Sequence, residues 1–390
     1  MQGVPHLYIL PKLHKMQALE PPIVGRPIAA CHSWITTHLS MYLADLLNSA
    51  LAKYDTVLQD RTELISLLEQ QEVGVDSWLV TFDVESLYPS IDQEECVQAC
   101  AEALCTSSGL ERAMVEDLLR FVLRNNIVQV EGKYYRQISG GAMGTNCLPQ
   151  AAQLYLALKW EAVMKEQYGP RFPAIFKRFI DDGVFIWHGS RWGLQYFLQD
   201  LNSLLPNINI TYTCSQFEVE YLDLVIYKAG PLGALDQRLK VRTHQKPLNR
   251  YLYIPFSSFH HSGMFNSFMH AELIRYVVTN SDRVWFDCMV SKFTHRLLRR
   301  GYPQAVISAA LAKVSYDRRP TYLHKAPTQS GASPTAFVVP YASGVPDMRL
   351  QSLLHTVYMQ HPEAHQYIPR PLVCFTKNRN LGSWLVRAGA

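Results

Sequence analysis

Two adjacent carboxylates, Asp181 and Asp182, stand between two short apolar runs in the segment FKRFIDDGVFIW at residues 176–187. Each run is β-prone, and an Asp-Gly pair between such runs is typical of a β-hairpin. Because Asp is common in turns, a turn alone explains both acids. The other interpretation is a hairpin tip that presents two like charges to a metal ion, and the rest of the chain decides between the two.

The order of segments from residue 78 onward predicts an α+β fold. A strand, helices, a hairpin, a further helix, a second hairpin, a helix and strands follow one another, which fits a split βαβ core with the second hairpin paired centrally. Ser90 followed by Gln93 resembles a capping box at the start of the first of these helices. The predicted segments are a strand at 78–82, helices at 91–105, 115–127 and 193–205, a hairpin at 127–138, and a long helix with Pro149 in its first turn.

The composition is that of an ordinary globular chain, with 48% hydrophobic and 18% charged residues among 390. This length suffices for two or three subdomains with substantial cores. No apolar run approaches the roughly 20 residues of a membrane span, and nothing near Met1 resembles a signal peptide. The eight cysteines form no CxxC pair. This pattern indicates neither a zinc site nor a disulfide framework and favours a reducing, intracellular compartment.

Basic residues are concentrated between residues 283 and 325, although the net charge is only +4. Aromatic side chains are interleaved with them, and this mixture suits a nucleic-acid backbone. A solvated basic helix face explains the same pattern equally well, so both interpretations stay open. His260 and His261 are adjacent, but no matching ligands stand at zinc-finger spacing, which favours a structural role.

A third carboxylate at a strand end is Asp83, which closes the buried run WLVTF. Phosphoryl transfer by two metal ions needs carboxylates from different strands that converge on ions about 4 Å apart. Mg²⁺ prefers a few carboxylates completed by water and phosphate oxygens. Asp83, Asp181 and Asp182 form such a sparse set, and three acids close together would repel one another strongly without metal.

Three stretches resemble the palm motifs A, B and C of reverse transcriptases in order and spacing: FDVESLYPSI, GGAMGTNCLPQAAQLYLALKWE and FKRFIDDGVFIW. LYILPKLHK with GRPI upstream, and VEYLDLVIYK downstream, resemble the Penelope-like retroelement branch in particular. KPLNRYLYIPFSSFHHS and the terminal FTKNRNLGSWLVRA resemble the thumb and post-thumb segments of that branch. The resemblance covers nearly the whole chain, and so many motifs in register favour a metal-binding hairpin over a simple turn.

The resemblance implies a right-hand polymerase with fingers, a palm built on a split βαβ ferredoxin-like sheet, and a helical thumb. The implied regions are fingers at 1–77 with 106–138 inserted, a palm at 78–230, a thumb at 231–350 and a post-thumb segment at 351–390. Many members of this branch carry a GIY-YIG endonuclease after the thumb, and none is recognisable here. The chain is therefore interpreted as an endonuclease-free type or as a fragment of a longer element.

By position, the resemblance implies that Asp83 and Asp181 ligate two Mg²⁺ ions, for which Mn²⁺ would substitute. Asp182 would support metal binding less directly, and the backbone carbonyl of Val84 would complete the shell of one ion. The implied reaction is RNA-directed DNA synthesis, in which a primer 3′-hydroxyl attacks a dNTP on an RNA template. RNA template, DNA primer and dNTPs are the expected partners, no membrane is expected, and the resemblance implies a nuclear location.

The resemblance also implies nucleotide contacts. Tyr88 occupies the sugar-gate position, where its ring would lie against deoxyribose and clash with a 2′-hydroxyl, although ordinary core packing is the alternative. Arg26 in GRPI resembles the arginine that grips the triphosphate, although a surface ion pair also explains it. Glycines in motif B would let the backbone approach the nucleotide closely. These glycines are Gly140, Gly141 and Gly144.

Contacts to the nucleic acid are implied at two places. Lys12 and Lys15 in PKLHK are candidate partners for phosphate or template, with an ordinary surface role equally open. Tyr221 and Leu222 in YLDL resemble the primer grip, whereas a structural role is favoured for Asp223 in the same stretch.

Two other functions compete with reverse transcription. An RNA-directed RNA polymerase would share the palm but commonly has a second Asp where this chain has Tyr88, so Tyr88 favours dNTPs. A decayed copy would bind nucleic acid without catalysis, although all three carboxylates are present. Leu148 also departs from the family pattern, because most reverse transcriptases have a small polar residue before the motif B proline.

Overall fold

Strand β4 (Trp78–Val84) is one of the two inner strands of a four-stranded antiparallel sheet. Its neighbours are β8 (Asp182–Trp187) and β9 (Ile210–Ser215), and β7 (Phe176–Phe179) completes the order β7–β8–β4–β9. The predicted hairpin therefore pairs with this inner strand, and the strand order is that of a split βαβ fold. The α+β class and the central pairing predicted from the sequence are confirmed.

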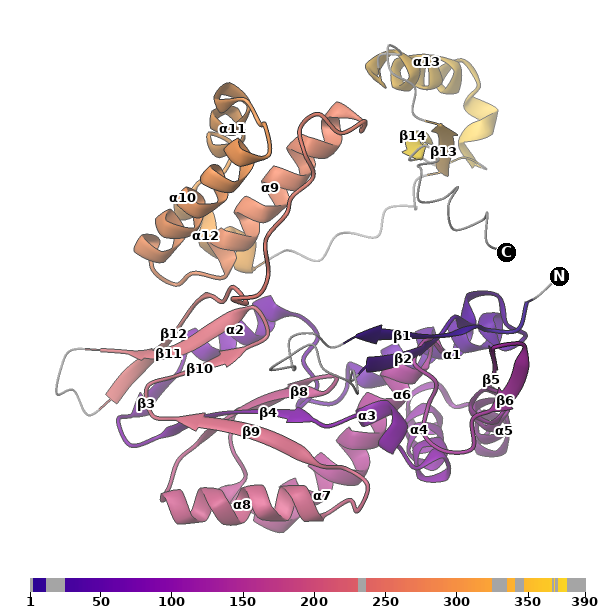
Figure 1. The fold of residues 1–390 in the computed structure, drawn as a ribbon, viewed down its shortest axis with the longest axis vertical. Helices are drawn as coiled ribbons and strands as arrows, with labels where there is room; N and C mark the ends of the chain where they lie inside the picture. Colours follow the sequence, from indigo (N-terminus) through magenta and orange to yellow (C-terminus); the bar gives the residue numbers. More distant parts are fainter. Residues whose placement is uncertain are drawn as a thin grey trace. The chain divides into compact units, whose positions relative to one another are not determined.

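The computed structural model divides into two compact units, Met1–Asn249 and Arg250–Ala390 (Figure 1). Lys12, Lys15 and all but the first two residues of FTKNRNLGSWLVRA lie outside the residues that the structure describes. The described residues are 3–11, 25–230, 236–324, 335–340, 347–366, 368 and 371–376.

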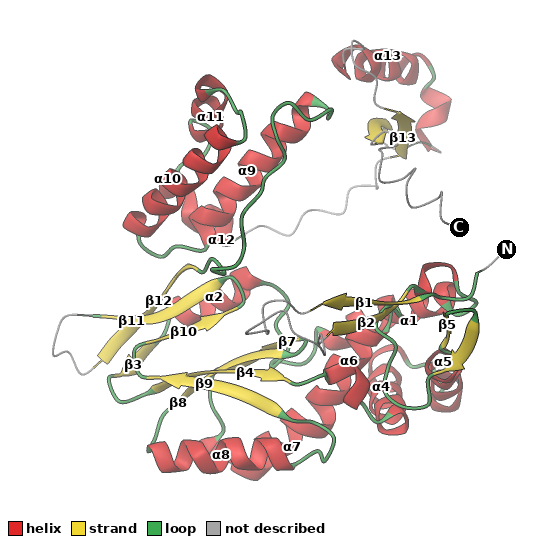
Figure 2. Cartoon of the chain, viewed as in Figure 1, coloured by secondary structure: helices red, strands yellow, loops and turns green. Residues whose placement is uncertain are grey.

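Helices bury one face of the central sheet (Figure 2). Val80, Phe82 and Val84 of β4 belong to this core, and side chains alternate along a strand, so Asp83 projects from the opposite face. The Phe82 ring lies edge-on to Trp160, with centroids 5.7 Å apart. The helices that share this core are α1 (Thr37–Leu51), α4 (Gln93–Ser108), α5 (Arg112–Arg124), α6 (Leu148–Leu156) and α8 (Arg191–Ser203).

The cap of α4 differs from the prediction. Asp92 is the N-cap residue, and its carboxylate accepts hydrogen bonds from the backbone N–H groups of Glu94 and Glu95, both at 2.9 Å. Ser90 instead ends the short helix α3 (Leu87–Ser90). The predicted Ser90–Gln93 capping box is therefore wrong, because Asp92 is an equally good cap and stands closer to the first helical residue.

A second four-stranded sheet has the order β10–β11–β12–β3. Its strands are β3 (Glu72–Gly74), β10 (Glu218–Tyr221), β11 (Leu224–Ala229) and β12 (Asp236–Thr243). The sequence predicts a helical thumb from residue 231, but β12 pairs with β11 and β3 and so belongs to the first unit. Helix α2 (Arg61–Glu69) immediately precedes β3 along the chain.

Two small two-stranded sheets complete the first unit. Strand β1 (Leu7–Pro11) pairs with β2 (Gly25–Ala29), and β5 (Ile127–Val130) pairs with β6 (Lys133–Arg136). The second pair is the hairpin predicted at 127–138, and its turn residues Glu131 and Gly132 have positive φ angles of 48° and 77°. A bridge between His6 and Gln129 joins the two small sheets.

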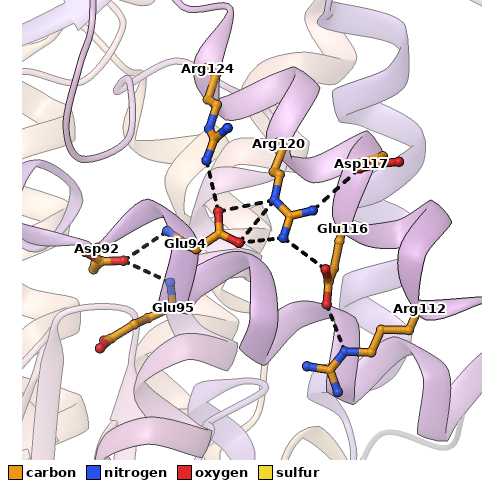
Figure 3. Close-up of polar contacts among 8 residues, drawn as sticks. All are labelled: Asp92, Glu94, Glu95, Arg112, Glu116, Asp117, Arg120 and Arg124. Atoms are coloured by element: carbon orange, nitrogen blue, oxygen red, sulfur yellow. Dashed lines mark hydrogen bonds and ion pairs between the residues drawn. The ribbon is translucent and has the colours of Figure 1, made fainter.

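Ion pairs join α4 to α5 (Figure 3). Arg120 donates through Nε to both carboxylate oxygens of Glu94, at 3.1 and 3.2 Å, and through Nη2 to Glu116 at 2.9 Å. Arg124 reaches Glu94 at 3.0 Å. The hydrogen bond from Arg120 is the main reason that the pKa of Glu94 lies below its usual value. The network ties the segment that follows residue 106 to a helix of the main core.

The second unit contains a helical bundle with its own core. Tyr276 and Phe293 lie in this core, with ring centroids 5.7 Å apart. Its helices are α9 (Ser262–Val278), α10 (Arg283–Arg299), α11 (Gln304–Leu311) and α12 (Arg319–Leu323), and further described elements of the unit are β13 (Thr335–Pro340), α13 (Asp347–Gln360) and β14 (Pro371–Thr376).

Several cations of the basic segment have structural partners. Arg300 donates to the Tyr253 carbonyl at 2.6 Å, and Arg319 donates to the carbonyls of Val277 and Val278 at the end of α9, at 3.1 and 3.0 Å. These contacts favour a structural role for part of the segment.

One of the two adjacent histidines, His261, has a structural role. His261 is the N-cap of α9, and its Nδ1 accepts a hydrogen bond from the N–H of Gly263 at 3.0 Å. Among the described helices of both units, none has the length and apolar character that a membrane crossing requires.

Glu94→Gln keeps the size of the side chain but removes the charge that Arg120 and Arg124 share. Because exposed ion pairs contribute little and are screened by salt, we expect the melting temperature to fall by about 1–3 °C at low salt and by less at high salt. Since folding lowers the pKa of Glu94, this stabilisation is present above the ordinary glutamate pKa and disappears as the pH falls into the acidic range. Thermal unfolding with Asp45→Asn, an exposed α1 substitution, as control measures the effect, and a loss that does not depend on salt would contradict the assignment.

Candidate active site

Asp83 and Asp182 lie directly opposite each other on neighbouring strands. The register of β4 and β8 pairs these two residues and, two positions further on, Thr81 with Val184. Directly opposite residues of an antiparallel pair project from the same face of the sheet, with Cβ atoms about 4.5–5.5 Å apart. Asp83 and Asp182, which are 99 residues apart in the sequence, therefore lie on one small area of the sheet.

Asp181 occupies the turn between β7 and β8. Phe179 pairs with Asp182, so Ile180 and Asp181 alone connect the two strands. Ile180 has a φ of 58°, a left-handed conformation that is rare for a β-branched residue. The Asp181 carbonyl accepts a hydrogen bond from the N–H of Val84 at 2.9 Å, so the turn is held against the end of β4.

The three carboxylates influence one another electrostatically. Burial is the main reason that the pKa of Asp182 is raised to about 6, and the negative charges of Asp181 and Asp83 act in the same direction. Lys246 has a smaller, opposing influence. Asp83 and Asp181 are thus close enough to Asp182 to repel its charge.

A divalent cation fits this donor set as an open site. In the described part of the chain, no group of three or more His, Cys, Asp or Glu side chains is arranged to hold a metal ion by itself. Mg²⁺, however, is usually bound by one or two carboxylates, with waters and substrate phosphates completing its shell. The opposed pair Asp83 and Asp182, with Asp181 beside it, suits that arrangement, and a cation would relieve the repulsion.

Tyr88 lies within electrostatic range of both the hairpin tip and Arg26. Burial raises the pKa of Tyr88, the charge of Asp181 raises it further, and the charge of Arg26 lowers it. The ring is half-buried and also packs against the main core. The structure therefore places Tyr88 within electrostatic range of Asp181 and of Arg26, and Tyr88 also has the packing role that was its alternative interpretation.

The motif B glycines allow close approach of protein backbone. A Cβ on Gly144, whose φ is 126°, would lie 2.0 Å from the Ala29 carbonyl oxygen of β2, and Ala29 donates to the Met143 carbonyl at 2.8 Å. The N–H of Gly141 donates to the Tyr88 carbonyl at 2.7 Å, and a Cβ on Gly140 would meet the backbone of α3. The loop is thereby fixed to β2 and α3, a reason for glycine that is independent of a nucleotide.

Tyr221 and Leu222 lie beside the carboxylates. Tyr221 is only 3% exposed, and its hydroxyl donates to the Asp182 carbonyl at 3.1 Å, which favours support of the hairpin over direct contact with a primer. Leu222 stands in the β10–β11 turn with a φ of 54°. A cavity of about 170 Å³ is lined by Thr81, Phe82, Asp83, Asp182, Thr211, Tyr212, Thr213, Glu220, Tyr221 and Leu222.

Arg178 is a residue of the site that the sequence interpretation did not select. It is fully buried in β7, three positions before Asp181, and its Nη1 donates to the Ile180 carbonyl at 2.7 Å. The segment FKRF carries two adjacent cations, Lys177 and Arg178, and nothing in the sequence shows that Arg178 is the one that is buried and needs a partner. Asp223, by contrast, pairs with Arg61 at 2.5 Å, in agreement with the structural role favoured for it.

No family model and no curated protein matches this chain. Among solved structures, telomerase from Candida albicans in complex with a TWJ fragment of telomeric RNA is similar, with a TM-score of 0.52 and 10% identity over 91% of this chain and 58% of that one. Apo telomerase from Candida tropicalis gives a TM-score of 0.47 and 9% identity over 90% of this chain and 61% of that one. The RNA-dependent RNA polymerase of a human picobirnavirus gives 0.46 and 13%, over 82% and 63%.

The chain spans little more than half the length of the Candida albicans telomerase that it matches. At this level of identity the likeness concerns the fold alone. The chain shares the α+β fold of the Candida albicans telomerase, which confirms the predicted fold class.

Asp182→Asn tests the cost of holding an ionised, partly buried carboxylate beside two others. Because the folded state raises the pKa of Asp182, the ionised carboxylate opposes folding; the opposition is absent below pH 4, grows as the pH rises through about 6 and is complete above it. One pKa unit corresponds to about 1.4 kcal/mol, and the side chain is partly exposed, so we expect Asp182→Asn to stabilise the metal-free protein by about 1–2 kcal/mol at neutral pH.

Chemical denaturation in EDTA across the pH range measures this difference. The gain should shrink as the pH falls from about 7 to about 4. The exposed Asp45→Asn substitution on α1 serves as the control. An Asp182→Asn protein that is no more stable than the unmodified protein at neutral pH would show that the ionised Asp182 carboxylate does not oppose folding.

Proposed function

We propose that this chain is an RNA-directed DNA polymerase of the Penelope-like type, which extends a primer 3′-hydroxyl with dNTPs on an RNA template. The observation that carries the proposal is the register that sets Asp83 opposite Asp182, with Asp181 in the adjoining turn. Carboxylates from two strands at one sheet face are the arrangement that metal-assisted phosphoryl transfer needs. The polymerase fold supports the class of reaction, and the sequence motifs support its particular type.

The carboxylates would act through bound Mg²⁺. Asp83 and Asp181, with the carbonyl of Val84, would hold two ions, and Asp182 would support them. When bound, such ions lower the pKa of the attacking hydroxyl and neutralise charge on the triphosphate. The contribution of the protein is to align the primer end with the α-phosphate and to keep the acids preorganised.

Nucleotide choice would depend on Tyr88 and Arg26. The ring of Tyr88 would lie against the sugar and exclude a 2′-hydroxyl, and the guanidinium of Arg26 would bind the triphosphate through charge-assisted hydrogen bonds. The influence of both Asp181 and Arg26 on the pKa of Tyr88 supports this grouping. An RNA polymerase would not need such a barrier to ribose.

Template and primer are the proposed partners. A related fold in complex with an RNA fragment supports an RNA partner. Lys12 and Lys15 are proposed as phosphate contacts on the resemblance alone. A nuclear site of action is proposed on the same ground.

Asp181→Asn keeps the shape of the side chain but removes the charge that would hold metal. We expect primer extension on poly(rA) with oligo(dT) to fall at least about 1,000-fold in Mg²⁺ and in Mn²⁺. Template affinity should stay within about twofold, because phosphate contacts from basic residues dominate it. Asp45→Asn is the matched control. Loss of template binding together with activity would mean that Asp181 is structural, and binding without any extension by the unmodified protein would favour a copy that has lost catalysis.

Tyr88→Ala removes the proposed barrier to the 2′-hydroxyl. We expect the preference for dNTP over rNTP to fall by about 10–100-fold, because a steric contact made only with the wrong sugar is lost. Tyr88→Phe keeps the ring and should keep the preference. Competition between dTTP and UTP on the same template measures the ratio. An unchanged ratio in Tyr88→Ala would remove the sugar-gate assignment.

A further inference from the structure

Three successive carbonyl groups at the hairpin tip accept hydrogen bonds from three different elements. The Ile180 carbonyl accepts from Arg178 Nη1 at 2.7 Å. The Asp181 carbonyl accepts from the N–H of Val84 at 2.9 Å, and the Asp182 carbonyl accepts from the Tyr221 hydroxyl at 3.1 Å. Because a carbonyl fixed in this way restricts the peptide plane on either side of it, these contacts limit the directions in which the Asp181 and Asp182 side chains can leave the backbone.

The Arg178 contact differs from the other two because it places a full charge in the interior. Arg178 is 0% exposed and Glu161 is 1% exposed. Nε of Arg178 donates to the Glu161 carboxylate, whose other oxygen accepts from the Thr56 hydroxyl, and Nη2 donates to the Gln153 carbonyl at 3.0 Å. All three guanidinium nitrogen atoms therefore donate hydrogen bonds: Nε and Nη2 to groups in the interior, and Nη1 to the Ile180 carbonyl in the turn.

The backbone of Arg178 is also held in place, and its partner Glu161 stands at an irregular point of a helix. The N–H of Arg178 donates to the Thr56 carbonyl at 2.8 Å, and the carbonyl of Arg178 accepts from the N–H of Leu58 at 2.9 Å. Glu161 ends a π-helical segment, Ala157–Glu161 (η3), which interrupts the path from α6 to α7 (Ala162–Tyr168). Such π-helical interruptions are rare and frequently occur at functional sites.

Stability alone is a poor explanation of this network. Replacing a buried ion pair by apolar residues of similar volume is often neutral or stabilising, because both charges lose their hydration. A buried pair does, however, specify geometry. The turn that it contacts needs such specification, because Ile180 holds a φ of 58° that a β-branched residue rarely adopts.

We propose that Arg178 is a positioning residue, which orients the Asp181–Asp182 turn through the Ile180 carbonyl and thereby sets the affinity of the carboxylates for divalent cations. This inference rests on the proposed function, since it assumes that the carboxylates bind metal. Glu161 and Thr56 act through Arg178 by holding its guanidinium in place. The planar fork of arginine is required, because one lysine ammonium cannot reach Glu161, Gln153 and Ile180 with the same geometry.

Two variants separate positioning from structural support. Arg178→Lys keeps the charge for Glu161 and removes the fork. The double variant Arg178→Met with Glu161→Leu removes both buried charges, a replacement that is often neutral or stabilising, and it also removes the contact to Ile180. Glu94→Gln, in the ion pairs between α4 and α5, is the control, because it alters a charged network away from the carboxylates.

The measurement is Mn²⁺ binding to the full chain, followed by electron paramagnetic resonance, with thermal unfolding of the same samples. We expect the dissociation constant for Mn²⁺ to rise about 10–100-fold in Arg178→Lys and in the double variant, as is usual when a residue that orients metal ligands is lost. The Mg²⁺ concentration for half-maximal primer extension should rise in parallel. The Glu94→Gln protein should match the unmodified protein in both.

The outcomes distinguish this inference from the proposed function. If the double variant folds and binds Mn²⁺ as tightly as the unmodified protein, Arg178 has only a structural role and the inference is wrong, whereas the proposed function stands. If the unmodified protein neither binds Mn²⁺ nor extends a primer, the proposed function fails, and the inference fails with it. If Arg178→Lys unfolds, the double variant still gives the answer.

Discussion

The pairing of β4 with β8 is the constraint on which the rest of the site depends. Side chains alternate between the two faces of a sheet, so a slip of one residue would bury one carboxylate under the helices and expose an aromatic ring in its place. The covered face prevents such a slip, because Gly183 lies opposite Phe82 and a Cβ there would come within 2.0 Å of the ring. Packing on one face therefore decides where the acids lie on the other.

Holding like charges together opposes folding, and other parts of the structure must supply the stability that the site lacks. The aromatic core beneath the sheet does so without specifying any detail of the turn. Detail comes from directional contacts, and three of them end on consecutive carbonyl groups of residues 180–182. Burial of apolar surface makes a large but non-directional contribution to the free energy of folding. Hydrogen bonds contribute little net stability, but they fix orientation.

Local signals were sufficient for most of the fold. Periodicity and turn residues predicted the central hairpin, the hairpin at 127–138 and the helix order, because each depends on neighbours in the sequence. Strand β12 was missed, since DQRLKVRT carries four charged residues among eight and resembles a surface segment more than a sheet strand. The α4 cap was misplaced because Ser90 and Asp92 are both good caps, and only the backbone shows which one begins the helix.

The site divides in the same way. The three acids, Tyr88 and Arg26 were predicted from motifs that resemble those of reverse transcriptases, and the structure sets Asp83 opposite Asp182 and places Tyr88 within electrostatic range of Asp181 and Arg26. Arg178 could not, because its partners Thr56 and Glu161 are remote in sequence and nothing local relates them. Gly144 was predicted to be near a nucleotide, whereas its neighbour in the structure is the carbonyl of Ala29, a contact that only the folded chain reveals.

The attachment of β2 to the motif B loop makes a mechanical unit of parts that are far apart in the sequence. Ala29 is hydrogen-bonded to Met143 and closely packed on Gly144, and the same loop is bonded through Gly141 to the carbonyl of Tyr88. No side chain would fit at position 144, because a Cβ there would lie 2.0 Å from the carbonyl oxygen of Ala29. The strand that carries Arg26 is therefore connected through this loop to the backbone of Tyr88, so the two side chains proposed to contact a nucleotide at opposite ends are held in one continuous set of backbone contacts.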